Sequence, residues 1–282
     1  MAASGALFLG LDIGTQSTKA LVLDATSRSV VARASATYGL IEGLPPGHAE
    51  QHPDTWVDAV RTVAREVLRS VDAARIQGVG VSGQQHGCVV LDERDQVIRP
   101  AKLWCDTSTA AEAAELSRAI GRAVPTGFTA SKLTWLQRHE PQHWARVRSV
   151  LLPHDYINFR LTGKKTMECG DASGSGVFDP AQRTFDARAV AAVHPGLDRM
   201  LPPLLHTGEG AGVLSAEGSA LLGLRAGIPV APGGGDNMMS AIGSGATRSG
   251  VVVVSLGTSG TVFTRTEHPV IDPQGQIGRA HV

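Results

Sequence analysis

Residues 10–19, GLDIGTQSTK, join two short apolar runs through a turn of small and hydroxyl-bearing residues. The runs at 7–11 and 20–23 are typical of β-strands, and the residues between them can turn tightly while exposing backbone N–H groups. Such amides can bind an anion, and Asp12 at the end of the first strand tolerates phosphate when a divalent cation lies between them. The stretch therefore predicts a phosphate-binding hairpin, with an ordinary polar hairpin as the alternative.

A second hairpin of the same kind is predicted near the other end of the chain. Residues 251–256 form a β-branched run, residues 257–260 (GTSG) can turn, and residues 261–264 resume strand character. Two similar turns in one chain favour the phosphate interpretation of each.

Composition limits the class of protein. The 282 residues exceed a typical single domain, and 26 Lys and Arg balance 26 Asp and Glu without a basic run, so nucleic acid is not expected as a partner. No signal-peptide pattern or bilayer-length apolar run occurs, so we expect a cytoplasmic protein that does not bind membranes. Cys88, Cys105 and Cys169 are odd in number and widely spaced, which favours core residues over disulfides or a metal knuckle.

The order of predicted elements indicates an α/β domain. Strands at 7–11, 20–23 and 30–37 form an antiparallel meander, and an amphipathic helix begins at Pro53. A buried strand at 76–81 then leads into the polar loop SGQQHG, a place where ligands commonly bind. Further helices are expected at 109–120, 131–139, 154–161, 187–193 and from Ser215, and short strands at 150–152 and 228–231.

A glycine-rich segment, PGGGDN at 232–237, follows the last of these strands and opens a helix predicted at 238–245. Its three glycines let the backbone approach a ligand closely. Asp236 lies near the start of the helix, where the helix dipole favours a carboxylate. A simple helix cap is the alternative interpretation of this aspartate.

Eight motifs in this chain resemble, in their order, those of the FGGY family of carbohydrate kinases, and within it the bacterial xylulokinases: GLDIGTQSTKALVLD, SGQQHG, LWCDTST, GFTASKLTWL, LLPHDYINFRLTG, GDASGSGVFD, GGGDN and SLGTSG. The resemblance implies ribonuclease-H-like domains of the actin and sugar-kinase ATPase superfamily. Residues 1–246 would form the sugar-binding domain with the catalytic base, and 247–282 the beginning of the nucleotide-binding domain. The resemblance stops near Gly275, which predicts a C-terminally truncated kinase.

This resemblance also implies roles in ATP-dependent phosphorylation of a ketose, with D-xylulose converted to D-xylulose 5-phosphate. Asp236 would be the general base, and Asp12 would position Mg²⁺ through water. Donors to the ATP phosphates would come from the two hairpins: Thr15, Gln16, Ser17 and Thr18 in the first, and Gly257, Thr258 and Ser259 in the second.

Sugar-binding residues are implied in three segments: Gln85 and His86, Trp104 and Asp106, and Asn237. Amide, imidazole and carboxylate groups can fix the hydroxyls of a sugar, and an aromatic face suits its apolar C–H surface. The alternatives are a loop histidine with its bonds already satisfied at His86 and a core anchor at Trp104.

Other functions are also conceivable for this sequence. His139-Glu140-Pro141-Gln142-His143 matches the HExxH pattern of zinc peptidases, but Pro141 predicts a break between two helices instead. A truncated domain that binds sugar without turnover, and a kinase for another sugar or polyol, stay open as alternatives. The sequence also leaves a homodimer open.

Overall fold

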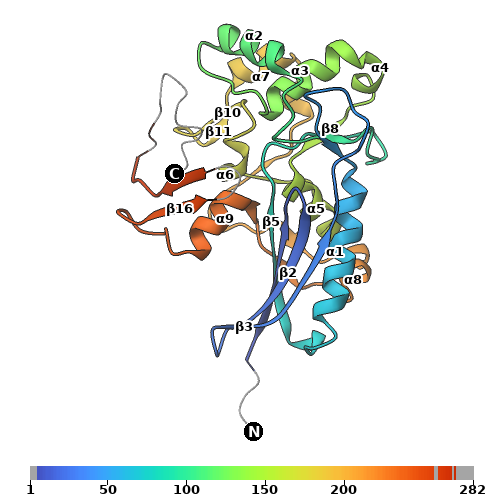
Figure 1. Ribbon diagram of the computed structural model, residues 1–282, viewed down its shortest axis with the longest axis vertical. Helices are drawn as coiled ribbons and strands as arrows, with labels where there is room; N and C mark the ends of the chain where they lie inside the picture. Colours follow the sequence, from blue (N-terminus) through green and yellow to red (C-terminus); the bar gives the residue numbers. More distant parts are fainter. Residues whose placement is uncertain (1–4, 257–259, 269, 271–282) are drawn as a thin grey trace.

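The computed structural model describes residues 5–256, 260–268 and 270 of the chain. Its centre is a seven-stranded mixed sheet (Figure 1), in which β1 to β3 form the predicted antiparallel meander and β5 joins β1 in parallel. The strands of this sheet, in the order β13, β14, β5, β1, β2, β3 with β15 also on β5, are Gly212–Val213, Pro229–Val230, Ile76–Gly83, Leu7–Ile13, Ser17–Asp24, Ser29–Thr37 and Gly234–Gly235.

Several strands of this sheet are longer than the sequence predicts, among them β1, which continues past Leu11 to Ile13. Strand β2 begins at Ser17, three residues early, and β5 continues through Ser82 to Gly83. The polar residues at these ends are paired in the sheet rather than lying in loops, because Asp12 is opposite both Lys19 and Ser82. The alternation of side chains between the two faces therefore extends to the candidate phosphate turn.

Three helices cover one face of the sheet: α1 (Pro53–Val67), α5 (Pro153–Thr162) and α8 (Ala216–Leu222). Helix α1 confirms the amphipathic helix predicted from Pro53, and Trp56, Val60 and Val63 are at most 1% exposed. They pack against the inward residues of β1 and β2 in the largest apolar core. This covered face carries most of the apolar burial that stabilises the fold.

A second layer of helices lies beyond the ends of the central strands (Figure 1). It contains α2 (Ala110–Ile120), α3 (Thr129–His139), α4 (Pro141–Trp144) and α7 (Ala187–Val193), with a separate core. The predicted break at Pro141 is confirmed, because α3 ends at His139 and α4 begins after Glu140. The HExxH residues therefore do not share one helix face.

The remaining elements are short or belong to the C-terminal part of the described chain. The predicted second hairpin is confirmed in its strands, which pair antiparallel, but its turn residues Gly257, Thr258 and Ser259 lie outside the described residues. These elements are β4 (Glu50–Gln51), η1 (Ala73–Arg75), β6 (Val89–Leu91), β7 (Ala101–Lys102), β8 (Ser149–Leu151), β9 (Met167–Glu168), α6 (Cys169–Ala172), β10 (Phe178–Asp179), β11 (Thr184–Phe185), η2 (Leu197–Arg199), β12 (Leu204–Leu205), α9 (Asp236–Gly243), β16 (Val252–Leu256) and β17 (Gly260–Thr264).

Two further sequence expectations can be compared with this fold. Cys88 and Cys169 are buried, Cys105 is partly buried, and all three thiols are free, which confirms that they are core or near-core residues. Among the described helices, none is both long enough and apolar enough to cross a membrane.

Candidate active site

Three strand ends bring the candidate catalytic residues to one place. Asp12 in β1 is opposite Ser82 in β5, and on the other side of β5 the short strand β15 aligns Gly235 with Gly83. Asp236 follows β15 directly as the first residue of α9. The two aspartates therefore flank the end of β5, although they lie more than two hundred residues apart in the chain.

The glycines before Asp236 are required by close packing. Gly233 has a φ of +71°, and a Cβ there would lie 2.1 Å from the carbonyl oxygen of Val81. A Cβ on Gly235 would lie 2.1 Å from Nε2 of Gln85. Asp236 accepts a hydrogen bond from the backbone N–H of Asn237 at 2.8 Å and lies at the start of α9.

Gln85 and Asn237 meet beside this aspartate. The side-chain amide of Asn237 donates to Oε1 of Gln85 at 3.3 Å. Gln85 is only 5% exposed, and within the described residues its Nε2 donor has no hydrogen-bond partner. A buried amide donor without a partner is destabilising unless a ligand or water accepts its hydrogen. Gln85 Nε2 is thus an unsatisfied donor beside Gly235 and Asp236.

His86 is held in an uncommon backbone conformation, with a φ of +62°. Its ring stacks on Phe128 with 4.5 Å between centroids, and Nδ1 lies 2.6 Å from the carbonyl oxygen of Gly174. A carbonyl only accepts, so Nδ1 carries the hydrogen and Nε2 is the acceptor of the neutral ring. The structure brings Gln85, His86, Asp236 and Asn237 into one neighbourhood.

In the first hairpin turn, some of the predicted phosphate donors are exposed and others already have partners within the protein. A bond from Gly14 N–H to Ser17 carbonyl closes the turn, Gln16 is exposed and Ser17 is partly exposed. Thr15 is engaged: its hydroxyl donates to Gln84 at 3.0 Å and accepts from the indole N–H of Trp104 at 2.9 Å.

The expectation for Thr18 has to be corrected for its side chain. Its hydroxyl is fully buried and lies 3.1 Å from the hydroxyl of Tyr38. The reason is the early start of β2, because alternation from Ser17 turns Thr18 towards α1 and Lys19 towards the open face. The Thr18 hydroxyl cannot reach a phosphate on that open face.

Asp106 likewise does not lie open to a sugar. Its side chain is 1% exposed and accepts from Ala49 N–H, Lys102 Nζ and both donors of Ser108. Burial alone would raise the pKa of Asp106, but the Ser108 and Ala49 hydrogen bonds and the charge of Lys102 hold it below its ordinary value. Asp106 is a buried anchor of the loop that carries the 46% exposed Trp104.

The cluster around Asp106 resembles a metal site in composition only. Ligand atoms of His48, Glu50 and Asp106 lie within 4.8 Å of one another. The ammonium group of Lys102 lies 3.2 Å from His48, 3.2 Å from Glu50 and 3.1 Å from Asp106, and 3.9 Å from the ring centre of Trp135. The ammonium group of Lys102 therefore supplies the positive charge that a metal ion would bring to this cluster.

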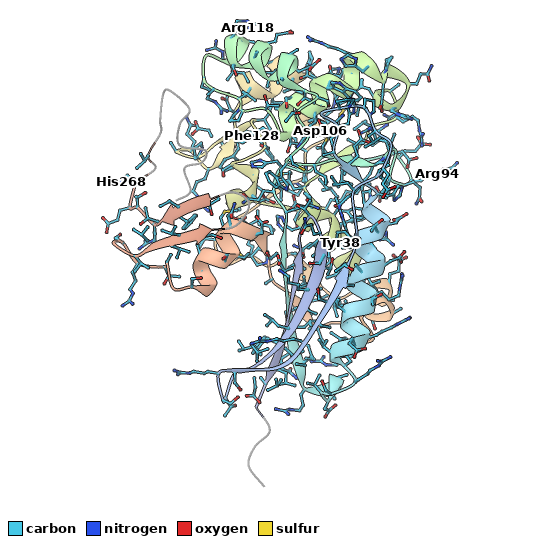
Figure 2. All side chains as sticks on the ribbon, viewed as in Figure 1. Tyr38, Arg94, Asp106, Arg118, Phe128 and His268 are labelled. Atoms are coloured by element: carbon cyan, nitrogen blue, oxygen red, sulfur yellow. The ribbon has the colours of Figure 1, made fainter. Side chains whose placement is uncertain are left out.

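Figure 2 places Asp106 and Phe128 in the layer beyond Tyr38 and the strand ends.

Sequence reasoning missed a buried ionic group behind the glycine segment. His154 is 0% exposed, with Nδ1 2.7 Å from Asp171 and Nε2 3.1 Å from Asp155, and it packs against Gly83 and Gly233. Burial would lower the pKa of His154, but the charges of Asp155 and Asp171 raise it to about 9. Burial raises the pKa of Asp155 to about 7. His154 and Asp155 lie in the sequence motif LLPHDY and Asp171 lies in GDAS, but the spacing of the two motifs does not show that these side chains meet.

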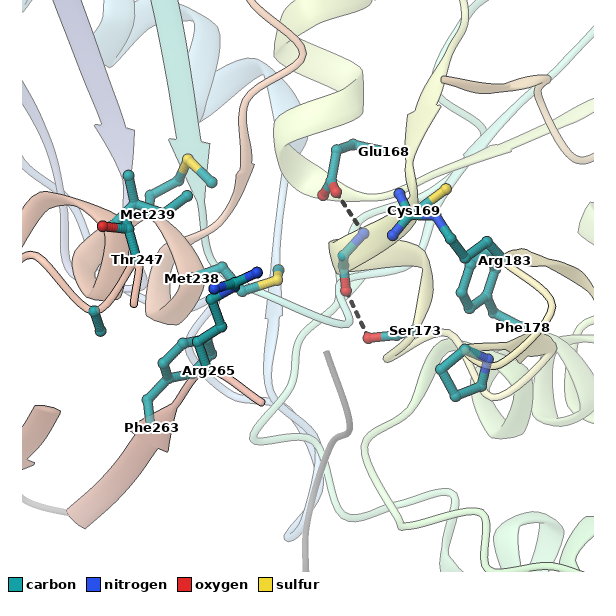
Figure 3. A pocket seen from close by; sticks show the side chains of 14 residues that line it. Glu168, Cys169, Ser173, Phe178, Arg183, Met238, Met239, Thr247, Phe263 and Arg265 are labelled. Atoms are coloured by element: carbon teal, nitrogen blue, oxygen red, sulfur yellow. Dashed lines mark hydrogen bonds between the residues drawn. The ribbon is translucent and has the colours of Figure 1, made fainter. Parts of the chain in front are cut away.

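Two hollows adjoin these residues. A groove of about 1110 Å³ on the open face of the sheet is lined by Asp12, Lys19, Ser82, Gly233 and neighbouring residues. A smaller one of about 310 Å³ lies between α6 and α9 (Figure 3), where Glu168, Met238, Arg183 and Arg265 contribute to its walls. One carboxylate oxygen of Asp12 accepts a hydrogen bond from the Ser82 hydroxyl at 2.9 Å. Because magnesium prefers oxygen ligands and usually keeps several of its waters, the carboxylate of Asp12 fits such an ion.

Comparison with known proteins identifies the class of this fold as that of the sugar kinases in the actin and hexokinase ATPase superfamily. Residues 7–243 match the model of the N-terminal domain of the FGGY family of carbohydrate kinases, and the chain belongs to that family. A xylulose kinase of Haemophilus influenzae is 40% identical over 94% of this chain and 57% of its own length. The chain thus spans about half the length of the curated relatives it matches.

Solved structures agree with this assignment. The crystal structure of a xyloylose kinase from Brucella ovis has a TM-score of 0.88 at 38% identity, over 95% of this chain and 57% of that one. A gluconate kinase from Lactobacillus acidophilus has a TM-score of 0.87 at 25% identity, over 95% and 56%. The fold of this domain is therefore shared by kinases named for different sugar substrates.

Proposed function

We propose that this chain forms the sugar-binding and general-base half of an ATP-dependent ketose kinase, with D-xylulose as substrate and D-xylulose 5-phosphate as product. The observation that carries the proposal is the convergence of Asp236, Asn237, Gln85 and His86 around the end of β5, where the amide nitrogen of Gln85 has no partner among the described residues. The names of the similar kinases favour xylulose over other sugars.

In this mechanism the protein positions two reactants and stabilises charge. Asp236 accepts the proton of the terminal hydroxyl of the sugar as its oxygen attacks the γ-phosphorus of ATP. Gln85, Asn237 and His86 orient the other hydroxyls, with the Nε2 atom of His86 as an acceptor. Trp104 would contribute an aromatic wall from the opposite side of the turn, where its indole is fixed by Thr15.

ATP would bind with its phosphates at the turn of the first hairpin, where the donors are the backbone N–H of Thr15 and the backbone and side chains of Gln16 and Ser17, since the Thr15 hydroxyl is bonded to Gln84. Asp12 would hold Mg²⁺ through water, and the ion supplies charge neutralisation between the phosphates. We further infer that residues 1–246 and 247–282 belong to different domains.

A second candidate function is sugar binding without turnover. It is favoured by one observation, that the candidate sugar contacts of Gln85, His86 and Asn237 all lie within the described residues. The test is an ADP-release assay with MgATP and a panel of ketoses, polyols and gluconate, beside calorimetric titration of D-xylulose without nucleotide.

Three outcomes of this test separate the candidates. ADP release that depends on D-xylulose supports the kinase. Xylulose binding without ADP release supports the binding domain. Selective response to gluconate or a polyol would contradict the assignment to xylulose.

A further inference from the structure

Lys132 is a buried cation near the N-terminus of a helix, where a positive charge is unfavourable. It lies in the first turn of α3, where the positive end of the helix dipole disfavours a cation, and its side chain is only 1% exposed. Burial lowers the pKa of its ammonium group to about 7. A cation in such surroundings requires strong compensating contacts.

Those contacts are two backbone carbonyls, one in each of two segments of the candidate site. Nζ of Lys132 donates to the carbonyl oxygens of His86 and Gly127, both at 2.5 Å. Gly127 in turn presses on the Trp104 segment, because a Cβ at Gly127 would lie 2.4 Å from the carbonyl oxygen of Trp104. One ammonium group therefore links the His86 loop to the turn that supports Trp104.

His86 is the residue that needs this link. Its φ of +62° lies in the left-handed region, which non-glycine residues adopt only when surrounding contacts hold them there. The ring is held by Phe128 and Gly174, whereas the carbonyl is held by Lys132 and, at 3.2 Å, by the hydroxyl of Thr129. Contacts to the ring and to the carbonyl thus together hold His86 in this conformation.

We propose that Lys132 is a positioning residue for sugar binding, which holds the His86 backbone left-handed so that the imidazole keeps Nε2 as an acceptor for a sugar hydroxyl. This role rests on the proposed function only in its last step, the contact between His86 and the sugar. The conformational step can be tested without any ligand.

The test compares Lys132→Met with Leu136→Ala in the full chain. Leu136 is a 2% exposed core residue one turn further along α3 with no bond to His86, so its truncation controls for lost stability. Nitrogen-15 NMR of the imidazoles should show a protonated Nδ1 at His86 in the wild type and in Leu136→Ala. Lys132→Met should lose that signature and show averaged ring nitrogens.

Calorimetric titration with D-xylulose gives the second readout. Lys132→Met should bind at least about ten-fold more weakly, the factor expected for loss of one hydrogen bond to a charged group, and Leu136→Ala should stay within about two-fold of wild type. Thr129→Val, which removes the longer bond to the same carbonyl, should weaken binding by a smaller factor.

The outcomes separate the two proposals. Wild-type tautomer and affinity in Lys132→Met would overturn the role of Lys132. Absence of xylulose binding in the wild type would overturn the sugar assignment, while the NMR comparison still decides whether Lys132 holds His86. If Lys132→Met does not fold, Lys132→Gln replaces it: its neutral amide should give intermediate affinity, and unchanged affinity and tautomer would refute the proposal.

Discussion

The two faces of the central sheet differ sharply although the same strands form both. On the covered face Leu7, Leu9 and Leu11 of β1 pack under α1 and are at most 2% exposed. On the open face the intervening residues are Phe8, Gly10 and Asp12, of which Phe8 is 41% exposed. Alternate residues of one strand thus serve stability and the candidate reaction separately.

The open face is also kept free of side chains where the strands meet. Gly10 is directly opposite Gly80, and a Cβ on Gly80 would have no atom within 4 Å. The groove there consequently has a floor of bare backbone leading to Asp12. Because the two faces differ in this way, substitutions in one strand should divide into those that change stability and those that change activity.

The largest effect is expected from Asp236→Asn, which tests the candidate active site. Turnover should fall by about 10³-fold or more, because an amide cannot accept the proton, while D-xylulose affinity stays within about three-fold. Steady-state kinetics and calorimetry measure the two quantities. Asp186→Asn, which changes the carboxylate capping α7, should leave both unchanged, since asparagine caps helices equally well. Near wild-type turnover in Asp236→Asn would rule out the general-base role.

Trp56→Ala tests the covered face. Trp56 is 0% exposed and donates to Gln51 at 2.9 Å, so the free energy of unfolding should fall by about 3–5 kcal/mol. Leu21→Ala on the open face, where Leu21 is 42% exposed, should change it by less than about 1 kcal/mol. Urea unfolding measures both. Similar losses in the two variants would contradict the division of labour between the faces.

Asp12→Asn should reduce activity without a large change in stability. An outer contact to a bound metal is typically worth 10- to 100-fold in metal affinity or activity, so the magnesium concentration for half-maximal turnover should rise by about that factor. A magnesium titration of the ADP-release rate measures it. Asp58→Asn, an exposed carboxylate on α1, serves as the control. An unchanged magnesium requirement would remove Asp12 from the metal site.

The smallest effect is expected from the pH dependence of the ionic group on the covered face. The pKa of His154 is raised from 6.5 to about 9, so its contribution to stability is complete below pH 6.5 and is lost as the pH rises through 9. The stability difference between wild type and His154→Gln should therefore shrink as the pH rises from about 6 to about 9.5. Leu133→Ala, an apolar core change, should show no such trend. A difference that grows with pH would reverse the assigned sign.

Sequence patterns predicted the parts of this fold that depend on local periodicity. The meander, α1 and the break at Pro141 follow from alternation, from an apolar stripe and from a missing N–H group. The direction of Thr18 was not predicted, since it depends on whether β2 begins at Ser17 or Ala20. The locations of Gln85, His86 and Asn237 follow from motif order, but their mutual contacts needed coordinates.

The unpredicted parts of the candidate site come from contacts between distant segments. Asp106 is buried where β4 and β7 pair, because Lys102 of β7 contacts both Asp106 and Glu50 of β4, and His154 meets Asp171 where α5 packs against α6. Lys132 appears in the sequence as one residue of an amphipathic helix, and its carbonyl partners are visible only in three dimensions. Charge at a buried position is the feature that composition and spacing do not reveal.

The short strand before Asp236 makes chain length itself a determinant of the site. Strand β15 contains only Gly234 and Gly235, paired with Ser82 and Gly83, and Asp236 follows at once. Deleting or adding one residue between β14 and Asp236 would shift the register of β15 by one residue, and Asp236 would then point to the opposite face of the sheet. Insertions and deletions here should be far more damaging than substitutions at Ala231 or Pro232, so related genes should vary this segment in composition and hardly ever in length.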